Sequence, residues 1–224
     1  MSIIIAIDGP AGTGKSTVSR AVAAKLGLEY FDTGATYRVA ALHCLREGVN
    51  LKNEEDVTVM VSTMNIEMRL DPANPAVILD HEDVSRLLHT DTISLIVSDV
   101  ATNLQARAVL GNMQRHLIAA SRKGAGMVVE GRDITSVIAP EAEVRVLLTA
   151  DDEVRVARRS GDGADPATVR EAVLGRDRKD ATVVEFHTAA DGVVQIDTTY
   201  LTIDEVVLAV VRLAEAQMAQ EASE

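Results

Sequence analysis

The segment 9–16, GPAGTGKS, constrains the fold of this chain more than any other, because it matches the phosphate-loop pattern G-x-x-x-x-G-K-[ST]. Residues 2–8, SIIIAID, are apolar on both alternating faces, which predicts a buried parallel strand. Residues 17–27 follow with apolar positions at helical spacing. This strand–loop–helix order argues against a chance match. Its glycines and the positive end of the helix predict a phosphate site.

Strand and helix patterns alternate through the rest of the chain, which predicts an α/β fold with a central parallel sheet between two helical layers. We expect one P-loop domain over residues 1–224: a core at about 1–35, 96–154 and 179–224, a small β-containing insert at about 36–95 and a short lid at about 155–178. Further strands are expected at 28–34, 65–80 (a pair), 125–129, 142–150 and 192–198, helices at 35–48, 91–124, 151–159, 169–181 and 202–218, and a Gly- and Asp-rich break at 160–168.

The composition bears on the class of ligand. The net charge of −12 and the lack of Trp argue against a binder of nucleic acid or of an anionic membrane. Of the 22 basic residues only five are lysine, which leaves 17 arginines. Arginine grips phosphate with two hydrogen bonds, so this composition fits a small anionic ligand; a high-GC genome is the alternative explanation.

The cysteine content and the distribution of apolar residues indicate a cytoplasmic protein. Cys44 is the single cysteine, so no intrachain disulfide can form, as is usual in a reducing compartment. The N-terminal run has no basic region before it and no cleavage site after it, and no apolar stretch is long enough to cross a membrane.

The phosphate loop alone does not say what happens to the nucleotide. Lys15 would reach the β- and γ-phosphates and Ser16 would ligate Mg²⁺. The chain has neither an N-K-x-D nor a D-x-x-G motif, which a GTPase needs. A short chain with one loop, a small insert and arginine-rich segments therefore favours a small-molecule kinase.

A kinase needs a second site for the acceptor, and three segments carry suitable residues. Thr33 and Arg38 lie in DTGATYR, Ser98 and Arg107 flank a helix start, and Arg132 with Asp133 follows the strand MVV. Ligands of open α/β sheets bind at the carboxyl ends of strands, which favours a functional role for Arg132 and Asp133. The others could equally be solvated charges and surface residues.

Two arginine-rich segments flank the Gly- and Asp-rich break. They hold Arg155, Arg158 and Arg159 on one side and residues 176–180, RDRKD, on the other. Arginines that close over phosphate oxygens can stabilise phosphoryl transfer electrostatically, so these segments predict a lid. A salt-bridged pair of helices is the alternative, and some of the charges must serve that role.

Together these motifs resemble the cytidylate kinases, the bacterial CMP/dCMP kinase branch of the nucleoside monophosphate kinases. The resemblance runs nearly end to end through IAIDGPAGTGKST, YFDTGATYR, VILDHEDVS, EGRDITSVIAPEAEVRVLLTA, RDRKD and QIDTTYLTIDEV. It implies transfer of the γ-phosphate of ATP to CMP or dCMP with Mg²⁺, a monomer, and an insert that binds the nucleoside monophosphate.

The resemblance also implies roles for single residues. ATP would be bound by Gly9, Pro10, Ala11, Gly12, Thr13, Gly14, Lys15, Ser16 and Thr17. CMP would be bound by Thr33, Arg38, Ser98, Arg107, Arg132, Asp133, Arg176 and Asp180. The catalytic set would be Lys15, Arg132 and Arg158, the last in the lid.

The chemistry of cytosine agrees with this assignment. A carboxylate such as Asp133 accepts a hydrogen bond from the N4 amino group, and Arg107 can donate to N3 or O2. Uracil presents a carbonyl where cytosine has the amino group, so Asp133 would lose its partner, at about 1–3 kcal/mol.

Two features depart from the family pattern. The family often has an arginine where this chain has Val183; that contact is either lost or supplied by Arg178. The segment between ARR and GRD is also short.

Two other functions remain open. The alternatives are a P-loop kinase of another acceptor, such as a shikimate- or gluconate-like molecule, and a catalytically weak nucleotide-binding regulator.

Overall fold

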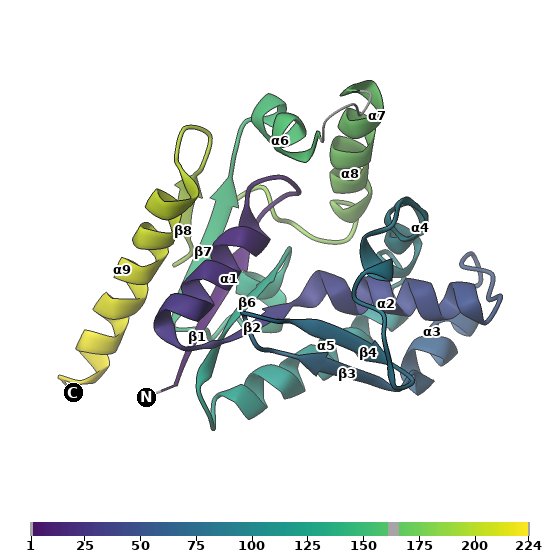
Figure 1. The fold of residues 1–224 in the computed structure, drawn as a ribbon, viewed down its shortest axis with the longest axis horizontal. Coiled ribbons are helices and arrows are strands. Elements are labelled where there is room, and N and C mark those ends of the chain that lie inside the picture. The colour runs from purple at the N-terminus through teal and green to yellow at the C-terminus, as the bar shows by residue number, and fades with distance from the viewer. Residues whose placement is uncertain (1, 161–165, 224) are drawn as a thin grey trace.

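A five-stranded parallel sheet organises the computed structural model, which describes residues 2–160 and 166–223 (Figure 1). The strand order is β2-β6-β1-β7-β8, and every neighbouring pair is parallel. The strands are β1 (Ile3–Asp8), β2 (Glu29–Asp32), β6 (Gly126–Gly131), β7 (Val144–Thr149) and β8 (Val194–Asp197). The predicted parallel strands are therefore present, and β1, apolar on both faces, lies in the centre and is fully buried.

Helices cover both faces of the sheet, which gives the predicted three-layer architecture. Helices α1 (Lys15–Leu26) and α9 (Ile203–Glu221) pack on the face formed by Ile3, Ile5 and Ile7. On the opposite face, Ile4 and Ala6 pack with α5 (Leu104–Ser121) and the π-helical turn η2 (Ile134–Ile138). The alternation of side chains along β1 thus supplies two separate apolar cores.

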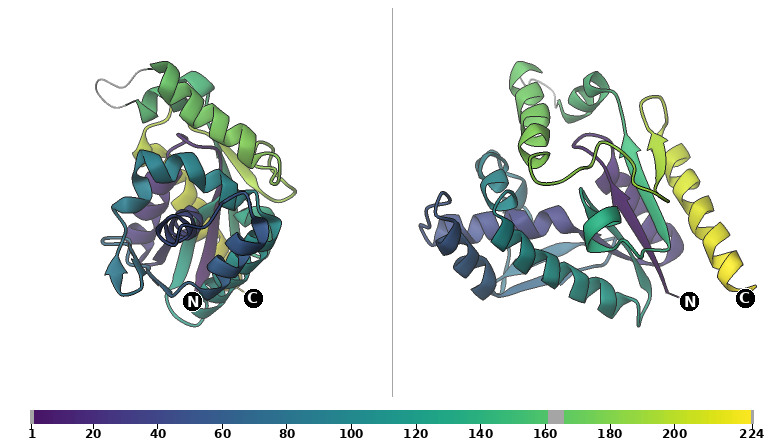
Figure 2. Two further views of the ribbon diagram at one scale, coloured as in Figure 1. Left: turned by 90° about the vertical axis from the view of Figure 1, so that its right-hand side faces the viewer. Right: turned by 180° about the vertical axis from the view of Figure 1, so that it is seen from behind.

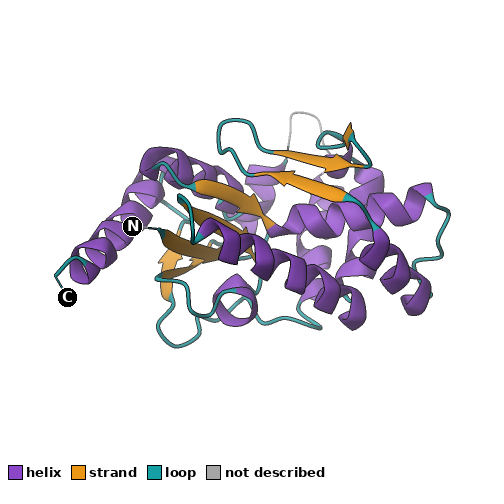
Figure 3. Ribbon diagram, turned by 90° about the horizontal axis from the view of Figure 1, so that it is seen from below, coloured by secondary structure: helices purple, strands orange, loops and turns teal. Residues whose placement is uncertain are grey.

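A small antiparallel sheet extends beside the main one (Figure 3). It consists of β3 (Ile66–Arg69), β4 (Ala76–Leu79) and β5 (Glu82–Asp83). The predicted strand pair at 65–80 is confirmed, and the short β5 is an addition to it. This sheet packs against α2 (Thr33–Arg46), α4 (Asp91–Ala101) and the 3₁₀ turn η1 (Leu87–His89). The pattern at 91–124 forms two helices, α4 and α5.

One helix, α3 (Glu54–Thr63), was not predicted from the sequence. It begins after Asn53, whose side chain accepts a hydrogen bond from the Asp56 N–H, and its first turn is acidic. Both features stabilise a helix N-terminus. Its apolar residues, Val57 and Val61, face the core shared with α2 and α5.

The predicted lid region forms a helical layer above the carboxyl ends of the strands (Figure 2). It contains α6 (Asp152–Arg159), α7 (Pro166–Arg170), the π-helical turn η3 (Glu171–Gly175) and α8 (Arg176–Asp180). The predicted break at 160–168 is wrong at its end, because the helix already starts at Pro166, a residue suited to a first helical turn. The remainder of that break, 161–165, lies outside the described residues. Within the described part of the chain, no helix has the length and apolar character to cross a membrane.

Gly126 is required where β6 begins. Its φ is 84°, and a Cβ there would lie 2.5 Å from the Ile3 carbonyl oxygen and 2.7 Å from the Ile3 nitrogen. We expect Gly126→Ala to lower the free energy of unfolding by about 2–4 kcal/mol, because the strained backbone and the clash both act against β1–β6 pairing. Urea denaturation measures this change.

Gly124→Ala is the matched control. Gly124 has no positive φ, and its Cβ would meet only the Ser121 oxygen at 3.7 Å. We expect a change within about 0.5 kcal/mol. Equal losses for the two variants would contradict the role given to Gly126.

Candidate active site

A cleft of about 700 Å³ opens at the carboxyl edge of the parallel sheet. The strand order reverses on either side of β1, and such a point is where open α/β sheets bind ligands. The register places Asp8 beside Gly131 and Asp32 beside Glu130, so the segments that follow three strands meet here. The charged side chains that line the cleft are Lys15, Asp32, Arg38, Glu130, Arg132, Arg158, Arg159 and Arg176.

The phosphate loop forms one wall of this cleft. Helix α1 begins at Lys15, and its N-cap, Gly14, has φ 93° and no capping side chain. The first backbone N–H groups of a helix have no partner within the helix, so they are available to phosphate oxygens. Ser16 and Thr17 are exposed at this end of α1. Residues 11–17 all line the cleft, whereas Gly9 and Pro10, which are also predicted to bind ATP, are buried and do not line it.

Lys15 lies beside the loop, with its Nζ 3.1 Å from the Pro10 carbonyl oxygen that accepts its hydrogen bond. Burial lowers the pKa of Lys15 to about 8, because the charged form loses hydration; the Glu130 carboxylate opposes this shift. The ammonium group is thus partly removed from water, and a phosphate would supply a compensating negative charge.

Glu130, whose role the sequence left unassigned, is buried at the end of β6. The Tyr30 hydroxyl donates a hydrogen bond of 2.5 Å to Glu130 Oε1. Burial, followed by repulsion from Asp32, raises the pKa of the Glu130 carboxyl, while Lys15 lowers it. Glu130 therefore faces the phosphate loop and is the nearby counter-charge of Lys15.

The oxygen donors of this wall suit Mg²⁺. Ser16, Asp32 and Glu130 all line the cleft, and Mg²⁺ prefers oxygen ligands supplied by few protein groups together with phosphates. Among the described residues, no group of three or more His, Cys, Asp or Glu side chains could hold a metal ion. Asp32 also caps α2, because its Oδ1 accepts from the Ala35 N–H at 3.3 Å.

Three arginines from separate elements converge opposite the phosphate loop. Arg38 comes from α2, Arg132 follows β6 and Arg176 begins α8. Burial and the neighbouring Arg38 and Arg132 lower the pKa of Arg176 to about 10. Burial likewise lowers the pKa of Arg38, and Arg132 contributes to this shift. Their mutual repulsion would be relieved by an anion bound among them.

Arg132 is held on three sides. Its Nη1 lies 2.8 Å from Asp177 Oδ1, and its Nε lies 3.2 Å from Asp180 Oδ2. The guanidinium also lies over the Phe186 ring, 4.6 Å from its centroid, which is a cation–π contact. Neither Asp177 nor Phe186 was among the predicted site residues.

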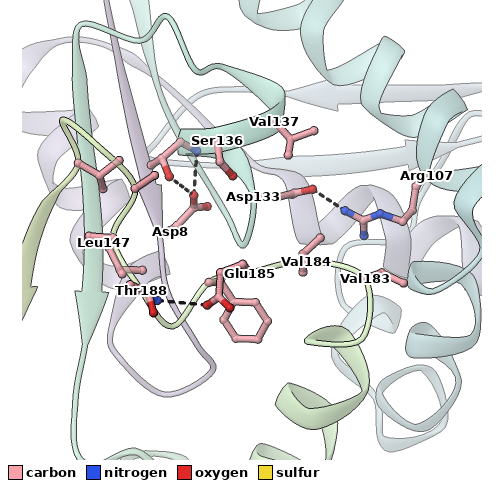
Figure 4. A pocket seen from close by; sticks show the side chains of 15 residues that line it. Asp8, Arg107, Asp133, Ser136, Val137, Leu147, Val183, Val184, Glu185 and Thr188 are labelled. Atoms are coloured by element: carbon pink, nitrogen blue, oxygen red, sulfur yellow. Dashed lines mark hydrogen bonds and ion pairs between the residues drawn. The ribbon is translucent and has the colours of Figure 1, made fainter.

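Of the three residues predicted to read cytosine, Arg107 and Asp133 are paired with each other, and Ser98 is paired with Asp180. Arg107 Nη2 donates to Asp133 Oδ2, and the guanidinium lies 5.6 Å from the centroid of the Tyr37 ring. Ser98 Oγ donates to Asp180 Oδ1 at 3.2 Å. Arg107 and Asp133 also border a second cavity of about 350 Å³, where they point toward one another (Figure 4). Burial raises the pKa of Asp133, and Arg107 opposes that shift.

Two predicted residues are engaged in structural contacts. Thr33 is buried, and its hydroxyl donates to the Glu130 carbonyl oxygen at 2.7 Å. Arg158 lines the cleft, and its Nη2 donates to the Thr198 carbonyl oxygen at 2.7 Å. Thr198 Oγ1 in turn donates to the Thr13 carbonyl oxygen of the phosphate loop at 3.1 Å. Arg158 therefore reaches the loop through Thr198.

Neither Val183 nor Arg178 lines the main cleft. Val183 lies in the wall of the second cavity. The side chain of Arg178 is 64% exposed and pairs with Glu171, so it points away from the cleft in this structure. Some charges of the lid region are thus salt bridges, as expected, and Arg155–Asp177 is another.

The fold and the cleft define a class of protein, a P-loop α/β protein with a cleft lined by lysine and arginine side chains. A gluconokinase from Sinorhizobium meliloti has a similar fold, with a TM-score of 0.52 and 16% identity, covering 100% of this chain and 97% of its own.

The family follows from closer relatives. Residues 5–216 match the family model of cytidylate kinase. Proteins named cytidylate kinase from Streptomyces griseus and Corynebacterium diphtheriae are each 42% identical to this chain. The alignments cover 96% and 95% of this chain, and 94% of each relative. The chain belongs to the cytidylate kinase family, which confirms the resemblance seen in its motifs.

We expect ATP binding to depend on pH, because burial lowers the pKa of Lys15 and Glu130 opposes that shift. Lys15 loses its charge as the pH rises through its lowered pKa, so we expect ATP affinity to fall above about pH 8. In Glu130→Gln the carboxylate that raises the pKa of Lys15 is removed, and the loss of affinity should begin at a lower pH. ATP titrations from about pH 6 to about pH 10 measure both curves.

Glu67→Gln is the control for this prediction. The Glu67 side chain is 67% exposed on β3, and its partner is Arg69. Its pH curve should superimpose on that of the unmodified protein. An unchanged curve for Glu130→Gln would mean that Glu130 does not support the charge of Lys15.

Proposed function

We propose that this protein transfers the γ-phosphate of ATP to CMP or dCMP, giving ADP and CDP or dCDP. The observation that carries the proposal is the arrangement of one cleft. Lys15 and the start of α1 form one wall, and Arg38, Arg132 and Arg176 form the other. Two phosphorylated ligands can therefore meet with their phosphates between two sets of positive groups.

The transfer itself requires orientation more than proton transfer. An oxygen of the CMP phosphate attacks the γ-phosphorus of ATP, a new P–O bond forms, and the bond to the ADP oxygen breaks. The attacking oxygen is already anionic, so it needs no general base. Lys15 and the loop N–H groups would hold the β- and γ-phosphates, while Arg38 and Arg132 would hold the phosphate of CMP.

Ser16, with Asp32 and Glu130 behind it, would hold Mg²⁺ together with the nucleotide phosphates. These are oxygen donors at one end of the cleft, which is the ligand set that Mg²⁺ prefers. When bound, Mg²⁺ offsets negative charge on the phosphate oxygens. Arg158, which lines the same cleft, would add positive charge from α6.

Recognition of cytosine would exchange one pairing for another. Arg107 and Asp133 now satisfy each other, and so do Ser98 and Asp180. Cytosine offers a donor at N4 and acceptors at N3 and O2, so it can take both partners of the first pair without leaving either unmet. Uracil can satisfy Arg107 but not Asp133. Arg176, Asp180 and Thr33 would hold the sugar and phosphate side.

The wider proposal follows the family. Residues of about 36–95 would form the nucleoside monophosphate insert and those of about 155–178 the lid, in one domain that acts as a monomer. The protein would serve pyrimidine nucleotide metabolism in the cytoplasm.

A coupled ADP-release assay with CMP, dCMP, UMP, AMP, shikimate and gluconate tests the function. We expect release with CMP and dCMP and weak release with the other acceptors. No release with any acceptor would leave only the nucleotide-binding regulator. Fastest release with shikimate or gluconate would point to a kinase of another class of acceptor.

Asp133→Ala tests the reading of cytosine in the same assay. Without the carboxylate that accepts from N4, the preference of kcat/KM for CMP over UMP should shrink about ten- to a hundredfold. The KM for ATP should change far less, since Asp133 does not line the main cleft. Arg132→Ala serves as the comparison, because it should depress kcat/KM for both monophosphates alike. An unchanged CMP-to-UMP ratio in Asp133→Ala would rule out this role.

A further inference from the structure

One buried carboxylate, Asp177, joins three segments that the cleft brings together. It lies on α8 and is 3% exposed. Its Oδ1 lies 2.8 Å from Arg132 Nη1 and accepts a hydrogen bond of 3.3 Å from the Ala11 N–H of the phosphate loop. Its Oδ2 accepts from Arg155 Nη1 of α6.

Arg155 also binds the phosphate loop directly. The same Nη1 donates to the Ala11 carbonyl oxygen at 2.9 Å, so Ala11 is bound through both its N–H and its C=O. Helix α6 also lies against the loop, because a Cβ on Gly12 would meet the Arg155 oxygen at 2.6 Å. Asp177 and Arg155 therefore hold the phosphate loop at Ala11.

The charges make this arrangement sensitive to Asp177. Arg155 is 4% exposed, and the Arg132 side chain is 14% exposed. A buried carboxylate between two guanidinium groups offsets their loss of hydration, and its removal leaves buried positive charge without compensation. Asp180 also pairs with Arg132, but its other contacts are Ser98 and Arg176, both predicted to bind CMP. Asp177 alone of these two contacts the phosphate loop.

We propose that Asp177 is a positioning residue for both nucleotides at once. It orients Arg132 toward the acceptor phosphate and holds Ala11 in the conformation that presents the loop to ATP. It contacts neither nucleotide, because its side chain is buried and does not line the cleft. The inference rests on the proposed function, since it gives Arg132 to the acceptor and the loop to the donor.

Asp177→Asn tests the inference. The amide keeps the size of the side chain and one oxygen acceptor but removes the charge. We expect the Kd for CMP and the Kd for ADP, measured by titration calorimetry, each to rise about three- to tenfold. The KM values for CMP and ATP in the ADP-release assay should rise with them.

A double variant tests whether Asp177 acts on CMP through Arg132 and on ADP through the phosphate loop. In Arg132→Ala, adding Asp177→Asn should leave the Kd for CMP unchanged, because the side chain through which Asp177 acts is gone. The Kd for ADP should still rise, because Ala11 and Arg155 remain. A residue that only stabilised the fold would not separate the two ligands in this way.

Glu171→Gln is the matched control. It makes the same acid-to-amide change nearby, on a side chain that is 73% exposed and pairs with Arg178. Both Kd values should stay as in the unmodified protein. Should Asp177→Asn fail to fold, Asp177→Glu keeps the charge and displaces it by one methylene group; it should raise both Kd values in the same direction.

The outcomes separate the two proposals. Unmodified protein that releases no ADP with CMP would overturn the proposed function. Active unmodified protein combined with an Asp177→Asn variant that loses only melting temperature or kcat, at unchanged Kd values, would overturn the positioning role. A rise in only one of the two Kd values would also overturn it.

Discussion

The repulsion among positive groups in one cleft is the constraint on which the rest of this structure depends. Burial and the neighbouring Arg38 and Arg132 lower the pKa of Arg176, and Lys15 lines the same cleft. Like charges this close repel one another, so the cluster needs anions from the protein or from a ligand. The parallel sheet makes the cluster possible, because its carboxyl edge collects the ends of β1, β2 and β6.

Buried carboxylates of the protein supply some of those anions. Asp177 and Asp180 neutralise Arg132 from the side of α8, and Glu130 neutralises Lys15 from beneath the loop. Asp133 does the same for Arg107. Arg107 and Arg132 therefore each have a carboxylate partner within the protein. Arg38 instead donates to the Leu88 carbonyl oxygen and the Ser94 hydroxyl. Such pairings favour ligands that offer the same hydrogen bonds.

Local pattern explains what the sequence could predict. The loop at 9–16, the buried strands and the capping box of Thr202 and Glu205 depend on neighbouring residues, and all are present. Helix α3 carried the same kind of signal in Asn53 and the acidic first turn, so it could have been predicted. Contacts between residues far apart in the sequence could not be predicted. Asp177 contacts Ala11 across 166 positions of the chain, and Tyr30 contacts Glu130 across 100. Only the folded sheet brings these residues together.

The segment after α8 shows how a departure from the family pattern can be accommodated. Val183 replaces the arginine that the resemblance leads one to expect, and Arg178 turns outward to Glu171. Yet the same segment places the buried ring of Phe186 under Arg132. A ring holds a guanidinium by its face while leaving the N–H edge to carboxylates and phosphates. It also adds no positive charge to a cleft that is already lined by five arginines. An aromatic contact thus orients Arg132 where a further arginine would have added to the repulsion.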